Sequence, residues 1–212
     1  MRKRKSWGFS FLFILISMMA TVPVYGASKV DLAKKAYNNL LSQKKITWNR
    51  DFKIDTDKLS FKVVDINGDK IPELYLEADV SLSAGPFRIY DYYNGKAREI
   101  DSNGRTYFEK CYPSKRVLVE HAAVKGVNFR SYSYVAPGEK PVMKLQFGFY
   151  RDQNYNIEKR YYKVGVNGQM IRISKSTCEK ELNKMIGNSK AVRLYGSKLH
   201  KNMVSNRNKY LK

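Results

Sequence analysis

Histidine and cysteine are scarce in this sequence, and their scarcity limits the chemistry that it can support. Only His121 and His200 are present, which excludes a metal centre built from several histidines. The sequence also lacks a phosphate-cradling glycine loop, a dinucleotide-binding fingerprint and a Gly-x-Ser-x-Gly nucleophile segment. No familiar catalytic motif is therefore present.

Acidic residues are few in the second half of the chain. Residues 111–212 hold 21 Lys and Arg but 6 Asp and Glu, whereas residues 27–110 hold 15 and 13. Such an excess favours an anionic polymer as a partner, because bound cations release counterions from the polymer. A solvated basic face that only aids solubility is the alternative. The candidate polyanion-binding residues are Lys184, Lys190, Arg193, Lys198, Lys201, Arg207, Lys209 and Lys212.

The N-terminal segment has the three parts of a secretory signal peptide. Basic residues at positions 2–5 precede the apolar run Phe9–Val22, which is short for a membrane-spanning helix. Pro23 follows, and we place cleavage after Gly26, so residues 1–26 would be removed. No later run is long enough to span a bilayer. The sequence thus predicts a secreted or extracytoplasmic protein that could associate with the cell wall, and an uncleaved signal anchor is the alternative.

Two cysteines, Cys111 and Cys178, remain after this cleavage. In an oxidising compartment they are candidates for a disulfide bond, which would stabilise the fold by about 4 kcal/mol. Two buried free thiols are the alternative. Cys111 and His121 are also a candidate thiol–imidazole pair, since a cysteine nucleophile needs a nearby base.

The hydrophobic pattern after residue 27 predicts an α+β fold. Ser28 and Asp31 have the spacing of a capping box, and apolar residues then recur at helical spacing, which predicts a helix over 29–43. β-prone runs follow, among them Leu59–Val64 and Glu73–Ala78, and Asn-Gly pairs such as Asn94-Gly95 mark hairpin turns between later runs. We expect an antiparallel β-meander of eight to ten strands.

The C-terminal part adds one short helix and a basic tail. Ser176 and Glu179 repeat the capping-box spacing, and Gly187 is suited to end the helix that they begin. We therefore expect one domain over residues 27–187 and a basic tail over 188–212.

The segment Asp65–Glu73 is the most informative motif in the sequence. Oxygen-bearing side chains stand at positions 1, 3, 5 and 9, and position 7 offers a backbone carbonyl, which suits the oxygen ligands that calcium prefers. Position 12 is Leu76 instead of Glu, which excludes an EF-hand. A solvated polar turn between strands is the alternative. The candidate calcium ligands are Asp65, Asn67, Asp69, Ile71 and Glu73.

The stretch Phe61–Leu76 resembles the Asp-x-Asn-x-Asp-Gly-x-x-Glu-Leu loops of integrin-type FG-GAP and VCBS-like modules. The chain is also similar to small exported proteins of clostridial-type Gram-positive bacteria, in which a helix precedes such a loop and Tyr-x-Tyr-x-Asn-Gly-Lys hairpins follow it. Lys70 replaces the glycine that the FG-GAP family usually has at position 6, where the backbone is left-handed. The resemblance implies an exported location, this style of fold and calcium ligation by the side chains of the loop.

These observations favour a secreted, non-catalytic surface or binding protein. Its basic C-terminal half would contact an anionic cell-wall or extracellular polymer, and calcium is the candidate stabilising cofactor. The alternative is a secreted hydrolase or toxin-like effector whose active site the sequence does not reveal.

Overall fold

A computed structural model of the chain describes residues 27–49, 52–80, 86–103, 106–124, 127–151, 154 and 156–212. The predicted signal peptide lies outside these ranges. None of the helices within them is both long and apolar enough to cross a membrane. The helices are α1 (Lys29–Leu41), α2 (Lys175–Ile186) and α3 (Val204–Tyr210). The strands are β1 (Lys45–Asn49), β2 (Phe52–Asp55), β3 (Leu59–Val64), β4 (Glu73–Ala78), β5 (Phe87–Tyr93), β6 (Lys96–Asn103), β7 (Thr106–Tyr112), β8 (Val117–Val124), β9 (Val127–Tyr134), β10 (Val142–Arg151), β11 (Ile157–Val164), β12 (Met170–Arg172), β13 (Val192–Arg193) and β14 (His200–Lys201).

The strands form three sheets, in which all the pairings between described strands are antiparallel. The five-stranded sheet has the order β14-β3-β4-β5-β6, the seven-stranded sheet has the order β12-β11-β10-β9-β8-β7-β13, and β1 pairs with β2 alone. The predicted α+β class, with a helix at the N-terminal end and a short helix near the C-terminal end, is confirmed. The described residues contain 14 strands, more than expected, because the shortest ones carry no alternating pattern.

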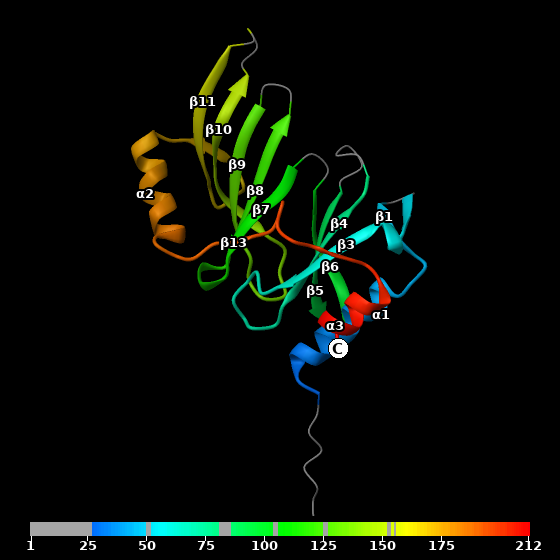
Figure 1. Cartoon of the computed structure of the whole chain (residues 1–212). Helices are drawn as coiled ribbons and strands as arrows, with labels where there is room; N and C mark the ends of the chain where they lie inside the picture. The colour runs from blue at the N-terminus through cyan, green and yellow to red at the C-terminus, as the bar shows by residue number, and fades with distance from the viewer. Residues whose placement is uncertain are drawn as a thin grey trace, which may run out of the picture.

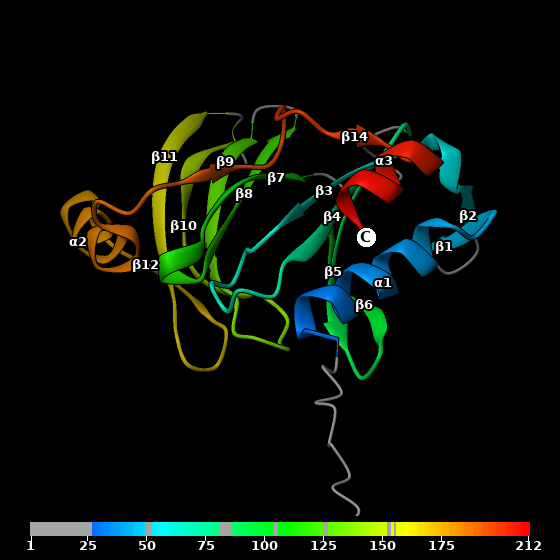
Figure 2. The same cartoon turned by 60° about the horizontal axis from the view of Figure 1, so that its bottom comes forward.

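Four layers stack on one another, in the order α2, seven-stranded sheet, five-stranded sheet, α1 (Figure 2). Tyr37 of α1 packs with Leu76 on the outer face of the five-stranded sheet. Ile89 and Leu118 belong to the cluster between the two sheets. Met185 of α2 belongs to a third cluster on the outer face of the seven-stranded sheet. Each sheet therefore buries both of its faces over part of its area.

The helix caps test the two predicted capping boxes. Ser28 Oγ accepts a hydrogen bond from Asp31 N at 3.1 Å, and Asp31 Oδ2 accepts one from Ser28 N at 3.3 Å, so the first box is confirmed. The second prediction was wrong by two residues. Ser174, not Ser176, caps α2, because its Oγ accepts a hydrogen bond from Thr177 N at 3.1 Å.

Residues 188–212 do not form the expected tail. They run across both sheets (the orange-to-red trace in Figure 1), where β13 pairs with β7 and β14 pairs with β3. Leu194 and Leu211 are fully buried along this path. We call residues 192–211 the C-terminal strap. Basic residues separate the buried residues of the strap along the chain. The sequence therefore shows no continuous apolar pattern that would predict it.

Candidate functional site

Cys111 and Cys178 are free thiols buried in different parts of the molecule. Cys111 lies in the cluster between the two sheets, whereas Cys178 packs on the outer face of the seven-stranded sheet. Burial raises the pKa of Cys111 to about 12 and that of Cys178 to about 11. The disulfide candidate is therefore not formed, and neither thiol provides a thiolate nucleophile at neutral pH.

In the loop between β3 and β4, acidic and amide side chains accept hydrogen bonds from backbone N–H groups of the same loop. Asp65 Oδ1 accepts a hydrogen bond from Gly68 N at 2.7 Å, and its Oδ2 accepts one from Lys70 N at 3.1 Å. Asn67 Oδ1 accepts from Asp69 N at 3.0 Å. Lys70 has a φ of 70°, which confirms the left-handed backbone expected at position 6.

Glu73 is the buried member of this loop. Its two carboxylate oxygens accept hydrogen bonds from Ile66 N and Asn67 Nδ2, each at 2.6 Å. Burial raises the pKa of Glu73 to about 8, and the negative charges of Asp69 and Asp65 add to the effect. The loop thus contains a desolvated carboxyl group beside two further acids.

A cation in this loop would rely partly on groups other than carboxylates. In the described ranges, no three His, Cys, Asp or Glu side chains gather closely enough to hold a metal ion. The amide oxygen of Asn67 and the carbonyl of Ile71 would have to complete the ligand set. Asp65 and Glu73 would also have to share oxygens that already accept hydrogen bonds.

The eight predicted polyanion-binding residues are distributed over α2, the C-terminal strap and the residues beside them. Lys184 lies on α2, where it pairs with Glu181, and Lys209 lies on α3. Arg207 donates a hydrogen bond to Asn202. Lys190, Arg193, Lys198, Lys201 and Lys212 are spread along the rest of residues 188–212. Arg193 differs from the others because it shares a cavity with two cationic residues outside the predicted set.

This cavity, which we call the basic pocket, has a volume of about 460 Å³ and lies where β7, β8, β9 and the C-terminal strap meet. Lys110, Arg130 and Arg193 supply three positive charges, and Glu109 is the one carboxylate among its described lining residues. The aromatic rings of Tyr107 and Tyr195 contribute to the wall, with their centroids 4.2 Å apart.

A β-bulge places two charged residues in this pocket. Phe108 pairs with Glu120, but the next pair in the register is Lys110 with Val119, so Glu109 is an extra residue on β7. Neighbouring residues of a regular strand point to opposite faces, whereas a bulge lets two of them share a face. Glu109 and Lys110 consequently both line the basic pocket.

The charges in the basic pocket are only partly paired. Glu109 Oε2 lies 2.6 Å from Arg130 Nε, and Glu109 Oε1 lies 3.3 Å from Lys110 Nζ. Burial opposes the ionisation of Glu109, but these two cations outweigh it and lower the pKa of the carboxyl group. The guanidinium of Arg193 has no hydrogen bond or ion pair with any described residue, which leaves its donors available to a ligand.

His121 is held in the pocket by two hydrogen bonds. Its Nε2 lies 2.8 Å from Asn128 Oδ1, and its Nδ1 bonds to the hydroxyl of Tyr107. Because the amide oxygen of Asn128 can only accept, Nε2 of His121 carries the proton of that hydrogen bond. Cys111 faces the opposite side of the sheet, so the candidate thiol–imidazole pair does not form.

The comparisons with known proteins leave the family of the chain open. No protein-family model matches the chain, and no curated protein matches it. A search of solved structures finds a chain described as "Structure of a Xanthomonas Type IV Secretion System related protein", with 12% identity and a TM-score of 0.39. The match covers 55% of this chain and 58% of that chain. A similarity this low identifies neither a shared fold nor a shared function.

Proposed function

We propose that the protein is an exported, non-catalytic binding protein that holds an anionic polymer in the basic pocket. The observation that carries this proposal is that Lys110, Arg130 and Arg193 converge on one cavity that Glu109 neutralises only in part. Polymers with closely spaced phosphate, sulfate or carboxylate groups attract such a site over long range, and counterion release adds to the affinity.

The guanidinium of Arg193, which pairs with none of the described residues, is the best-placed contact for the polymer. A guanidinium group presents parallel N–H donors that match two oxygens of a phosphate or carboxylate. Arg130 is already oriented by Glu109, so less side-chain freedom is lost when a ligand binds. The exported location predicted from the sequence would bring this pocket into contact with acidic wall or extracellular polymers.

Binding to inorganic polyphosphate tests the proposal. We would compare the wild-type chain, Lys110→Gln/Arg193→Gln and the control Lys29→Gln/Lys35→Gln, whose charges lie on α1 and which loses the same number of positive charges. We expect the pocket variant to bind at least about tenfold more weakly, and the slope of log affinity against log salt to fall by about 2.

The control variant distinguishes binding in the basic pocket from binding that depends only on the net charge of the chain. If both double variants lose affinity equally, the net charge of the chain drives binding and the pocket has no special role. If the wild-type chain does not bind polyphosphate at low salt, the proposed function is wrong.

We also propose, as a second candidate function, that calcium binds the Asp65–Glu73 loop and stabilises the fold. The supporting observation is Glu73, a buried carboxyl group whose charge is disfavoured by its own burial and by Asp69 and Asp65. A divalent cation would offset this repulsion, and it would take oxygens from the loop residues already named.

Thermal unfolding with calcium and then with a chelator tests the second candidate. Calcium should raise the melting temperature of the wild-type chain, because a ligand that binds only the folded state stabilises it. Asp65→Asn/Asp69→Asn should abolish the rise. Glu139→Gln/Glu179→Gln, which removes two exposed acids, should preserve it. An identical melting temperature for the wild-type chain with calcium and with chelator would exclude the calcium site.

A further inference from the structure

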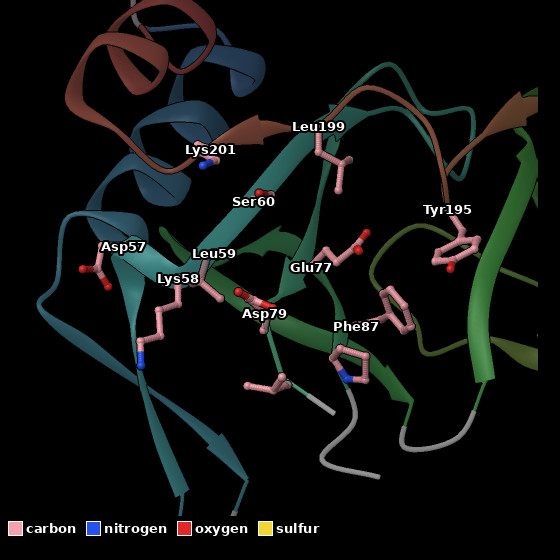
Figure 3. A pocket seen from close by; sticks show the side chains of 13 residues that line it. Asp57, Lys58, Leu59, Ser60, Glu77, Asp79, Phe87, Tyr195, Leu199 and Lys201 are labelled. Carbon is pink, nitrogen blue, oxygen red and sulfur yellow. The ribbon is translucent and has the colours of Figure 1, made fainter. Parts of the chain in front are cut away.

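A second cavity, of about 520 Å³, lies at one end of the gap between the two sheets. Acidic residues outnumber basic ones in its lining, in contrast to the basic pocket. We call it the acidic cavity. Asp57, Glu77 and Asp79 line it, together with the apolar side chains of Phe87 and Leu199. Figure 3 shows that the five-stranded sheet supplies one wall, and that Leu199 and Tyr195 of the C-terminal strap form the facing wall.

Glu77 is the acid that is withdrawn from solvent. It lies on β4, is half-buried, and extends toward Leu199 and Tyr195 (Figure 3). Its carboxylate has no hydrogen bond or ion pair with any described residue. Burial raises the pKa of Glu77, as expected for a carboxyl group that has lost water and gained no partner.

Tyr75 is a buried polar residue close to Glu77, although it does not itself line the acidic cavity. It lies two residues before Glu77 on the same strand, so both side chains leave the same face of the sheet. Tyr75 is 0% exposed, and its hydroxyl has no hydrogen-bond partner within the described part of the chain. Burial raises its pKa, and Glu77 and Tyr195, which both line the acidic cavity, add to the rise. Buried hydroxyl groups are normally hydrogen-bonded, so the hydroxyl of Tyr75 is an exception among the described residues on the same face of β4 as Glu77.

The aromatic residues suit a particular kind of ligand. The rings of Tyr75 and Phe87 are stacked with centroids 6.3 Å apart, and the ring of Phe87 meets that of Tyr195 edge to face at 5.7 Å. Faces of aromatic rings attract cations, and their apolar surface accepts a hydrocarbon chain.

Two lysines also line the cavity and reduce its negative charge. Lys58 and Lys201 are both exposed, and neither forms an ion pair with a described acid of the cavity. Water therefore screens them strongly, whereas the half-buried Glu77 is screened less. The field at the buried end of the cavity is set mainly by Glu77.

We propose that the acidic cavity binds an ammonium or guanidinium group carried on a short apolar stem. The cationic head pairs with Glu77, and the stem packs between Phe87 and the side chains of Leu199 and Tyr195. This site is separate from the basic pocket in its charge and in its ligand, although Tyr195 contributes to both cavities. It does not depend on the polymer-binding function.

Titration of the full chain with n-butylammonium, followed by NMR and calorimetry, tests the proposal, with 1-butanol as the neutral probe of the same length. We expect butylammonium to bind and to shift the ring resonances of Phe87 and Tyr195, and butanol to bind at least about tenfold more weakly. Glu77→Gln should weaken butylammonium binding by about the same factor. Glu139→Gln, which removes an exposed acid, should leave it unchanged.

Each other outcome overturns the proposal. Equal binding of the two probes would mean that the cavity selects only apolar surface. Full affinity in Glu77→Gln, or ring shifts confined to other aromatic residues, would place the cation elsewhere. The shifts in the wild-type chain decide the matter even if Glu77→Gln does not fold. Lys110→Gln/Arg193→Gln should bind butylammonium normally, which separates this result from a failure of polyphosphate binding.

Discussion

Arg130 and Glu109 form an ion pair across an intervening strand, with 2.6 Å between Nε and Oε2. Arg130 lies on β9 and Glu109 on β7, and β8 separates the two strands. The bulge at Glu109 makes the contact possible, because it turns this side chain to the face on which Arg130 lies. Glu109 therefore orients one cation of the basic pocket while it reduces the positive charge of the whole pocket.

The substitution Glu109→Gln should separate these two effects. We expect polyphosphate affinity to rise several-fold, since one negative charge leaves the pocket, and stability to fall by about 1 kcal/mol, the range of a partly exposed ion pair. Polyphosphate titration and chemical denaturation measure the two quantities. Glu179→Gln, which removes an exposed acid paired with Lys175, is the control for net charge. A loss of polyphosphate affinity in Glu109→Gln would contradict this prediction, and it would mean that the orientation of Arg130 by Glu109 outweighs the charge that Glu109 removes from the pocket.

Glu73 should make stability depend on pH when no cation is bound. Its folded-state pKa of about 8 lies above the ordinary value of 4.5, so the folded state favours the protonated form. The resulting stabilisation is fully present below about pH 4.5 and is lost as the pH rises to about 8. Relative to Glu73→Gln, the wild-type chain should therefore lose stability across this window, as measured by chemical denaturation in a chelator. Parallel pH profiles of the two chains would show that Glu73 does not titrate in this way.

Two glycines allow steric clash to be distinguished from backbone strain. Gly68 and Gly95 both have positive φ, at 73° and 81°. A Cβ on Gly68 would lie 2.3 Å from the carbonyl oxygen of Pro113, whereas a Cβ on Gly95 would meet nothing within 4 Å. We expect Gly95→Ala to cost about 1 kcal/mol of stability and Gly68→Ala about 3 kcal/mol or more. Equal losses in denaturation experiments would mean that the contact with Pro113 relaxes freely.

Asn202 should be the most sensitive residue of the C-terminal strap. Its buried Nδ2 donates to the carbonyls of Leu41 and Thr56, each at 2.9 Å, and so ties the strap to the end of α1. Asn202→Asp removes both donors and should cost about 3 kcal/mol, because the carbonyls remain buried. Asn206→Asp, which loses one exposed bond to the carbonyl of Lys201, should cost less than about 1 kcal/mol. Similar losses in the two variants would contradict this role of Asn202.

Local features of the fold could be predicted from the sequence, because local interactions determine them. The strands Leu59–Val64 and Glu73–Ala78 begin and end as the alternation predicted, and the capping box at Ser28 has both of its hydrogen bonds. The second cap was misplaced because Ser174 and Ser176 each precede a helical pattern, and only the backbone geometry selects Ser174.

The basic pocket could not be predicted in the same way. Tyr107, His121 and Arg130 lie on three different strands and become neighbours only through the register of β7, β8 and β9. Register depends on a bulge at Glu109 that no turn residue signals in the sequence. The clustering of positive charge near the C-terminus was visible, but it pointed to the eight residues at the end of the chain, and Arg193 alone among them lines this pocket.

The C-terminal strap has a consequence for the order in which the molecule is assembled. β13 forms one edge of the seven-stranded sheet and β14 forms one edge of the five-stranded sheet, and both strands are synthesised after all their partner strands. Chains released early, before residue 192, would lack both edge strands and expose unpaired backbone at β7 and β3. The outer edges of both sheets can therefore be completed only after residues 192–201 have been added to the chain.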